Sequence, residues 1–308
     1  MKTDVTTLGE ALIDLTQIGC REDGVPLFAA NPGGAPANVA VAVSRLGGRA
    51  AFLGMVGKDG FGTYLREVLE ENDVDTTSLC TSDVPTTMAI VSVDAHGERD
   101  FRFNRGADNY FSSADVDVGQ IGRSKFLHFG SISLTGGPSR EATYAALREA
   151  KKRGVRISYD PNYRAVLWPN ESEAIKWMKD PLPYVDVIKL SDEELPLITG
   201  TDNLEWGTAV LRDEGISLVL VTLGGNGAFY RMGEQTGKVA GVQTTIADTN
   251  GAGDTFLGAV LCKLSARLEG EPLLSSELEE ILAYANRAAS ITCSRSGAIP
   301  AMPRADEV

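Results

Sequence analysis

The sequence is poor in the residue types that most often bind metals or form cross-links. Its 308 residues include four cysteines and two histidines. The cysteines are Cys20, Cys80, Cys262 and Cys293. No two of them have the Cys-x-x-Cys spacing, which argues against a zinc site or a disulfide framework and favours reduced thiols. His96 lies in a turn-like stretch and His128 in an apolar one, so we expect a surface histidine and a core histidine.

The sequence also lacks long apolar runs and an excess of positive charge. No stretch approaches the ~18 uncharged apolar residues that a membrane span needs, and residues 1–5 are not a basic segment followed by an apolar one. The formal net charge is −13, with the acidic residues scattered along the chain. Such a charge opposes binding to nucleic-acid backbones and anionic membranes. We therefore expect a cytoplasmic protein whose partners are small molecules, with no nucleic acid and no membrane among them.

Two common nucleotide-binding signatures are missing as well. The sequence contains neither a Gly-x-x-x-x-Gly-Lys-Ser/Thr loop nor a Gly-x-Gly-x-x-Gly turn. A Walker-type NTPase and a typical dinucleotide enzyme are therefore not supported. Any phosphate site in this chain must be of another kind.

What the sequence does contain is an alternation of strand-like and helix-like segments. Apolar, strand-like segments lie at residues 5–15, 50–56, 125–134, 155–160, 185–190 and 218–223. Segments with helical spacing lie at residues 62–71, 139–153, 206–212 and 278–293. This alternation predicts an α/β fold, a doubly wound and mostly parallel sheet flanked by helices, with right-handed crossovers.

Two segments depart from the alternation. Residues 16–30 have no helical period, and residues 86–104 alternate with a period of two around a turn, which indicates a β-hairpin. We expect them to form a small β-sheet lid that excludes water from the site, with residues 1–15, 31–85 and 105–308 forming the α/β domain. The alternative is a surface hairpin that lies flat on the main body.

A projecting lid would leave one face and its edges exposed. Alternating apolar residues in the hairpin, such as Ala89 and Val91, would favour covering that face. Pairing two lids across a twofold axis covers both, because the same patch then serves each subunit. We therefore expect a homodimer joined through the lids, with a monomer as the alternative.

The candidate for chemistry is the glycine-rich turn Gly251-Ala252-Gly253. It joins strand-like residues 239–246 to a segment with helical spacing. Backbone N–H groups at a helix N-terminus lack partners and carry partial positive charge, so this turn could bind phosphate. Asp254 follows it and could accept the proton of an attacking hydroxyl. An equally good interpretation of the turn alone is an acidic residue that complements the helix dipole.

Polar residues also follow other predicted strands, at the edge where open α/β sheets bind ligands. Asp14 could bind a polyol, and Gly33 and Gly34 would let the backbone approach a ligand near Asn38. Arg164 could meet a phosphate with two hydrogen bonds. A carboxylate that ends a strand, a plain glycine turn and a structural arginine pair are the competing interpretations.

Two further loops carry possible ligand groups. Ser191 followed by Glu194 fits a helix capping box, and carboxylates there could also hold magnesium through water. A second glycine loop, residues 224–227, follows the strand-like segment 218–223.

Six stretches in this order resemble the ribokinase-like (PfkB) family of carbohydrate kinases. They are Leu8-Gly-Glu-Ala-Leu-Ile-Asp14, Pro32-Gly-Gly-Ala-Pro-Ala-Asn38, Phe129-Gly-Ser-Ile-Ser133, Asp160-Pro-Asn-Tyr-Arg164, Asp248-Thr-Asn-Gly-Ala-Gly-Asp254 and Gly297-Ala-Ile-Pro300. The resemblance runs from Leu8 to Pro303 and is strongest to the fructokinases of bacteria and plants.

The resemblance implies roles for particular residues. It makes Asp254 the base and Gly251, Ala252 and Gly253 the anion hole. It assigns the sugar to Asp14, Gly33, Gly34 and Asn38, with Phe103 and Arg105 closing over it. It assigns ATP to Thr222, Gly224, Gly227 and Asn286, magnesium to Glu194, and a monovalent cation such as potassium to Asp248, Asn250, Arg295 and Gly297.

Two positions depart from the family's pattern. Ser191 stands where the family has the Asn of Asn-x-x-Glu, and Asn250 replaces the usual Thr. The implied activity is ATP-dependent transfer of the γ-phosphoryl group to a sugar's primary hydroxyl, with fructose as first choice. Alternatives within the family are 2-keto-3-deoxygluconate, ribose and aminoimidazole riboside. Alternatives of other classes are a non-catalytic sugar or nucleotide sensor and an NAD-dependent oxidoreductase.

Overall fold

The computed structural model describes residues 2–93, 99–267 and 270–308. The turn expected around His96 lies outside these residues. The main sheet has the strand order β13-β12-β11-β10-β9-β8-β1-β4-β5. Its strands are β1 (Thr3–Leu8), β4 (Ala50–Gly57), β5 (Leu79–Ser82), β8 (Ser124–Gly130), β9 (Arg156–Asp160), β10 (Val187–Ser191), β11 (Leu218–Thr222), β12 (Ala228–Met232) and β13 (Gln235–Val239). All neighbours from β5 to β11 are parallel, and β12 and β13 add an antiparallel edge.

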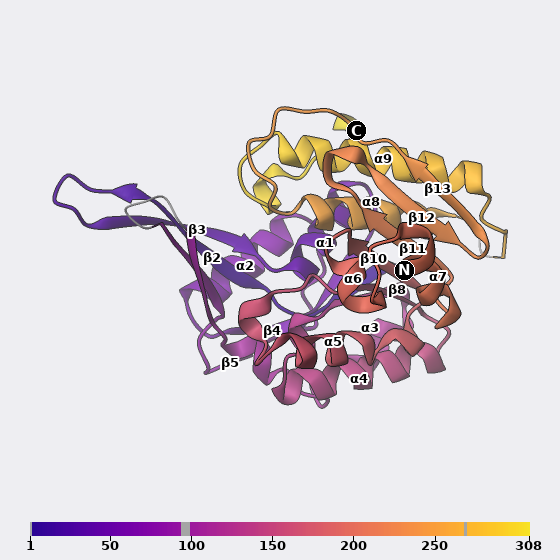
Figure 1. Cartoon of the computed structure of the whole chain (residues 1–308). Helices are drawn as coiled ribbons and strands as arrows, with labels where there is room; N and C mark the ends of the chain where they lie inside the picture. The colour runs from indigo at the N-terminus through magenta and orange to yellow at the C-terminus, as the bar shows by residue number, and fades with distance from the viewer. Residues whose placement is uncertain (1, 94–98, 268–269) are drawn as a thin grey trace.

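Helices cover both faces of this sheet (Figure 1). They are α1 (Ala35–Arg45), α2 (Gly60–Glu71), α3 (Val118–Gly122), α4 (Gly137–Lys152), α5 (Glu171–Lys179), α6 (Glu194–Thr199), α7 (Leu204–Asp213), α8 (Ala252–Ala266) and α9 (Ser275–Cys293). One apolar core lies between the sheet and α1, α2, α8 and α9. The other lies between the sheet and α3 to α7. The inner strands, such as β4 and β8, are buried along nearly their whole length, which is why they read as nearly continuous apolar runs. The predicted doubly wound, mostly parallel fold is confirmed.

A second, four-stranded sheet has the order β3-β2-β6-β7. Its strands are β2 (Leu12–Cys20), β3 (Pro26–Gly33), β6 (Met88–Val93) and β7 (Arg99–Asn104). The two excursions therefore combine in one small sheet, as predicted, and the β2–β3 hairpin projects from the body at the left of Figure 1. β2 and β3 extend past residues 16–30 at both ends, and the division of the chain into a kinase domain and a lid stays a prediction.

The prediction of one opening strand over residues 5–15 is wrong. The chain forms β1 in the main sheet and then β2 in the second sheet. Gly9 lies between them with φ of +149°, a conformation that is easy only without a side chain. Gly9 thus separates the end of β1 in the main sheet from the start of β2 in the second sheet.

The expected strand over residues 239–246 is also wrong. β13 ends at Val239, and no regular structure follows up to the start of α8. A Cβ added at Gly227 would meet the backbone of residues 239–241, so the chain passes against the glycine loop after β11. Asn286 fixes this course, because its Nδ2 donates to the Ala240 carbonyl at 2.9 Å.

Several expectations based on scarce residues can be checked directly. His128 is a core residue, as predicted, with Nδ1 3.2 Å from Ser158 Oγ. Burial lowers the pKa of His128 to about 3, so the ring is neutral near pH 7. The four cysteines are free thiols. Within the part of the chain that the structure describes, no helix combines the length and apolar character of a membrane span.

Candidate active site

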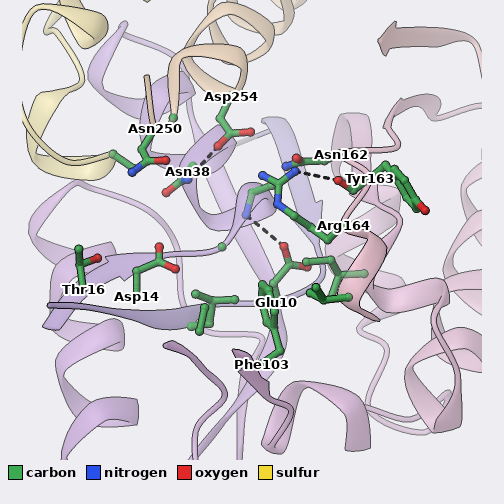
Figure 2. Close-up of a pocket in the computed structure, with 18 of the residues that line it drawn as sticks. Glu10, Asp14, Thr16, Asn38, Phe103, Asn162, Tyr163, Arg164, Asn250 and Asp254 are labelled. Carbon is green, nitrogen blue, oxygen red and sulfur yellow. Dashed lines mark hydrogen bonds between the residues drawn. The ribbon is translucent and has the colours of Figure 1, made fainter. Parts of the chain in front are cut away.

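A cavity of about 470 Å³ opens where the second sheet faces the carboxyl edge of the main sheet. Its lining includes Asp14 and Thr16 from β2, Asn38 from α1, Arg164 from the loop after β9 and Asp254 from α8 (Figure 2). These residues come from distant parts of the chain. Carboxylates, an amide and a guanidinium around one cavity can bind several hydroxyls and a phosphate.

Asp254 lies in the first turn of α8 and is 7% exposed. Asn38 Nδ2 donates to Asp254 Oδ2 at 2.8 Å, which fixes the carboxylate against the cavity. Burial raises the pKa of Asp254 to about 6, and the nearby Asp160 adds to the rise. The carboxylate is therefore ionised near pH 7 and more basic than an exposed aspartate, as a general base requires.

The N-terminal end of α8 is built to accept an anion. Gly251 has φ of +75°, and no side chain caps the helix. A Cβ on Gly251 would lie 2.9 Å from the Ala298 Cβ, and a Cβ on Gly253 would lie 3.0 Å from the Lys189 Nζ. The turn therefore needs glycine at both positions, because Ala298 and Lys189 pack closely against its backbone. Uncapped N–H groups and the helix dipole favour a phosphate here.

The residues predicted to bind the sugar lie on β2, at the end of β3 and in the first turns of α1, and Asp14, Gly34 and Asn38 line the cavity. Asp14 faces it from β2, and burial raises the Asp14 pKa to about 6. A Cβ on Gly33 would strike the Asp14 carboxylate, and a Cβ on Gly34 would strike the Glu10 carbonyl, so bare backbone is needed at both positions. The Oδ1 of Asn38 is buried with no hydrogen-bond partner among the described residues. A buried polar atom of this kind is suited to a ligand hydroxyl.

The two expected closing residues differ in position. Phe103 lines the cavity from β7. Arg105 turns instead to Asp108, with Nη2 2.8 Å from Asp108 Oδ2, and its Nη1 donates to Thr135 Oγ1 at 2.7 Å. The structure thus uses Arg105 to anchor the end of β7 to the main body. Closure of Arg105 over a sugar would require these contacts to break.

The residues predicted to bind ATP lie at the end of β11, in the turn that follows it and, for Asn286, on α9, and none of them is among the cavity-lining residues. Thr222 ends β11 and pairs with Ser191 at the end of β10. Its Oγ1 donates to the Leu190 carbonyl at 3.2 Å. Gly224 and Gly227 follow with positive φ, in a turn whose one side chain larger than hydrogen is that of Asn226. ATP contacts at these positions stay a prediction.

Glu194 holds two loops of the ligand edge together. Its Oε1 accepts from the Tyr163 N–H at 2.7 Å, and its Oε2 accepts from the Ser191 N–H at 2.8 Å. The Glu194 N–H donates to Ser191 Oγ at 3.2 Å, which is the reciprocal bonding of the predicted capping box. Both carboxylate oxygens keep lone pairs for water. No group of three metal-ligating side chains occurs within the described part of the chain.

Asp248 joins the two loops to which the resemblance assigns a monovalent cation. Its Oδ1 accepts from the Asn250 N–H at 3.0 Å, and its Oδ2 accepts from the Gly297 N–H at 3.0 Å. The guanidinium of Arg295 pairs with Glu307 at the surface. The two loops are therefore linked by the carboxylate of Asp248 and not by the side chain of Asn250, and a monovalent cation at these loops stays a prediction.

Sequence reasoning gave no role to two buried charged residues of this site. Lys189 Nζ donates to Asp160 Oδ2 at 2.7 Å beneath the start of α8. A lysine inside the apolar stretch of β10 is the signal that could have identified it. Glu10 lines the cavity, and its Oε1 accepts from the Ala35 N–H at 3.1 Å. Burial raises the pKa of Glu10 to about 8, so this carboxyl is mainly protonated near pH 7.

Comparisons with known proteins agree with this geometry. The family model described as pfkB family carbohydrate kinase matches residues 2–305. The Arabidopsis thaliana protein named "Probable fructokinase-4" is 42% identical over 316 residues, covering 100% of this chain and 96% of its own length. A fructokinase from Xylella fastidiosa with bound ATP has a TM-score of 0.89 at 31% identity, over 99% of this chain and 97% of that one. A double mutant of the Vibrio cholerae O395 fructokinase, with fructose, ADP and potassium ion bound, has a TM-score of 0.87 at 32% identity, over 98% and 96%.

Proposed function

The chain belongs to the pfkB family of carbohydrate kinases, and we propose that it transfers the γ-phosphoryl group of ATP to the primary hydroxyl of fructose, giving fructose 6-phosphate. The observation that carries the proposal is the position of Asp254. This buried carboxylate lies at the uncapped N-terminal end of α8 and shares one cavity with Asp14 and Asn38. The site therefore combines a base, an anion-binding helix end and hydroxyl ligands. The similar fructokinases with fructose or ATP bound support the same substrates.

The reaction follows from these positions. Asp14, Asn38 and the backbone at Gly33 and Gly34 bind the sugar hydroxyls and aim the primary hydroxyl at Asp254. As that oxygen forms its bond to the γ-phosphorus, its proton passes to Asp254. The bond between the γ-phosphorus and the bridging oxygen breaks, and its electron pair stays on ADP. The start of α8 stabilises the charge on the transferring group, and positioning supplies most of the remaining acceleration.

Two ions complete the proposal. Glu194 would hold a magnesium ion bound with ATP by accepting hydrogen bonds from its waters, and such an ion would supply positive charge against the phosphates. The carbonyls of the loops joined by Asp248 would hold a monovalent cation such as potassium beside the start of α8. The similar Vibrio cholerae fructokinase in a potassium-ion-bound form supports a monovalent cation as a ligand of this chain. Free thiols and an ATP co-substrate fit the expected cytoplasmic location.

We also propose that the second sheet is a lid that closes over the sugar and joins two subunits. Four large apolar side chains are exposed on the β2–β3 hairpin, namely Ile18, Val25, Leu27 and Phe28. A projecting hairpin with this surface gains from a second copy, which would cover apolar area and sheet edges together. Covering it across a twofold axis makes a homodimer.

Comparison of acceptors tests the proposed function. Release of ADP is measured with a coupled assay, using ATP, magnesium and millimolar fructose, ribose, 2-keto-3-deoxygluconate or aminoimidazole riboside. We expect fructose to have the highest kcat/KM, because a sugar that leaves the polar groups of the site unpaired can lose ~10⁴-fold. Faster turnover of another acceptor would transfer the assignment to that acceptor. Binding of fructose without ADP release would support a sensor.

A further inference from the structure

We propose that Lys189 is a positioning residue for phosphoryl transfer, holding the start of α8 in place and keeping a positive charge beneath it. The inference rests on the proposed function, since it concerns the same phosphate site. It adds a buried cation that neither the base nor the backbone anion hole supplies.

Lys189 is an unusual residue for its place in the fold. It is the third residue of β10, and its neighbours Ile188 and Leu190 are fully buried. Lys189 itself is 7% exposed. An ammonium group at such a position costs much solvation energy unless a partner compensates it. Packing alone does not explain a lysine at this position, because an apolar side chain of similar length would fill the same space.

The partner is Asp160 at the end of β9, which is 1% exposed. Lys189 Nζ and Asp160 Oδ2 are 2.7 Å apart. Asp160 Oδ1 also accepts from the Asn162 N–H at 3.2 Å, and Asn162 and Arg164 line the cavity. The pair thus connects β10 to the loop that carries Arg164.

The same ammonium group packs against the phosphate-binding turn. A Cβ on Gly253 would lie 3.0 Å from Lys189 Nζ, so the glycine backbone rests on this group. The charged groups that act on Lys189 are Asp160 of β9, Glu194 of α6 and Asp254 of α8, while His128 of β8 is neutral. Burial alone would lower the pKa of Lys189, but these carboxylates raise it, so the group is charged.

A charge in this place acts in the same direction as the helix dipole. It lies under the backbone N–H groups that would face the transferring phosphoryl group, and it is itself buried. Fixed positive charge aimed at a developing negative charge is worth far more there than in water. If the ion pair were purely structural, removing one partner would lower stability by leaving the other charge buried and unpaired. Removing both partners together would then leave activity close to that of the wild type.

Three variants separate the two roles: Lys189→Met, Asp160→Asn and the double variant Asp160→Asn with Lys189→Met. Each is measured for kcat, for KM of fructose and of ATP, and for thermal unfolding. Lys189→Met should lose ~10²-fold in kcat, as removal of one transition-state donor does. The double variant should recover stability, because no unpaired charge is left buried, yet its kcat should stay at least about 30-fold below wild type.

The pH dependence of kcat gives a readout that a packing defect would not produce. Asp254 is acted on by Asp160, Lys189 and Arg164, and it contacts the uncharged Asn38. Loss of the ammonium should move the acidic limb of the profile to higher pH, and Asp160→Asn should move it to lower pH.

Lys125→Met is the matched control. Lys125 lies on β8, and its Nζ pairs with Asp4 Oδ1 at 2.9 Å, at the other end of the sheet. This variant should lose stability and keep its kcat. A double variant at residues 160 and 189 with kcat within threefold of wild type would overturn the inference alone. A wild-type protein inactive on every acceptor would overturn the proposed function, and the inference with it.

Discussion

Three carboxyl groups line the cavity, of which those of Glu10 and Asp254 are buried and that of Asp14 is half-buried. Burial raises the pKa of each above its ordinary value. The charge of Asp254 also raises the pKa of Asp14, while the guanidinium of Arg164 lowers the pKa of both carboxyl groups. The carboxyl groups of the site are therefore more basic than exposed ones.

Activity should therefore depend on pH with an acidic limb near pH 6. The base must be ionised to accept a proton, and the pKa of Asp254 is about 6. We expect kcat/KM for fructose to be constant above this value and to fall as pH drops through about 6. Asp14 titrates in the same range, so the limb reports on the pair. Initial rates between pH 5 and about 8 check this. A limb centred near pH 4, as for exposed aspartates, would contradict it.

Glu10→Gln should flatten the dependence of stability on pH. The carboxyl has a pKa of about 8 in the folded chain and an ordinary value of 4.5. Between these values the folded state holds a proton that the unfolded state has lost, so wild-type stability falls as pH rises from 4.5 to about 8. Glutamine keeps an acceptor for the Ala35 N–H and does not titrate. We expect a gain of ~1–3 kcal/mol near pH 8 and little change near pH 4.5 by chemical denaturation. Equal pH slopes would contradict this account.

Single residues differ in how far the sequence reveals them. The position of Asp254 after a glycine turn could be predicted, because helix N-termini have local signals. The ion pair of Arg105 with Asp108 could not be predicted from the sequence, because it depends on the conformation of the turn after β7. Lys189 was passed over, since a lysine in an apolar strand is informative only when the groups packed around it are known.

At the scale of elements, the start of α8 and the second sheet determine the site. The α8 helix could be predicted from its spacing, but the strand expected before it does not form. Close backbone contact between Gly227 and the chain after β13 turns that segment away from the sheet. Likewise Gly9 divides one apolar run between two sheets. Hydrophobic period and strand propensity describe one segment by itself. Here the end of each strand depends on a glycine whose contacts or backbone conformation cannot be predicted from that segment alone.

The β2–β3 hairpin carries the prediction that belongs to this scale. Phe28 of β3 is 40% exposed. Phe28→Lys should weaken the lid-mediated dimer about tenfold or more, because an aromatic side chain contributes ~1.5–3 kcal/mol when buried. The KM of fructose should rise as well, since a loosened lid shields the site less. Sedimentation velocity over a range of concentrations measures the first effect.

Trp206→Lys is the control, because Trp206 is 72% exposed on α7, far from the hairpin. It should leave the dimer unchanged. A wild-type chain that sediments as a monomer at micromolar concentration with full activity would exclude the lid-mediated dimer.

At the scale of the whole molecule, the architecture concentrates distant residues at one edge. The parallel strands β1, β8, β9, β10 and β11 end at the same edge of the sheet, and residues after β1, β8 and β9 line the cavity together with residues of α1 and α8. The alternation of segments was enough to predict this edge as the ligand site. The sequence could not show which loops face one cavity and which lie beyond it, as the loops of Thr222 and Gly224 do. Which loops line the cavity depends on where the second sheet lies relative to the main sheet, because residues of the second sheet form one wall of the cavity.

The most direct test of the account is the turnover of Asp254→Asn. Asparagine keeps the size of the side chain and an oxygen for the Asn38 amide, but it cannot take the proton. We expect kcat with fructose to fall ~10²-fold or more, while the Kd of ATP measured by calorimetry stays within a few-fold of wild type. If this variant folds, binds ATP and phosphorylates fructose at the wild-type rate, Asp254 is not the base.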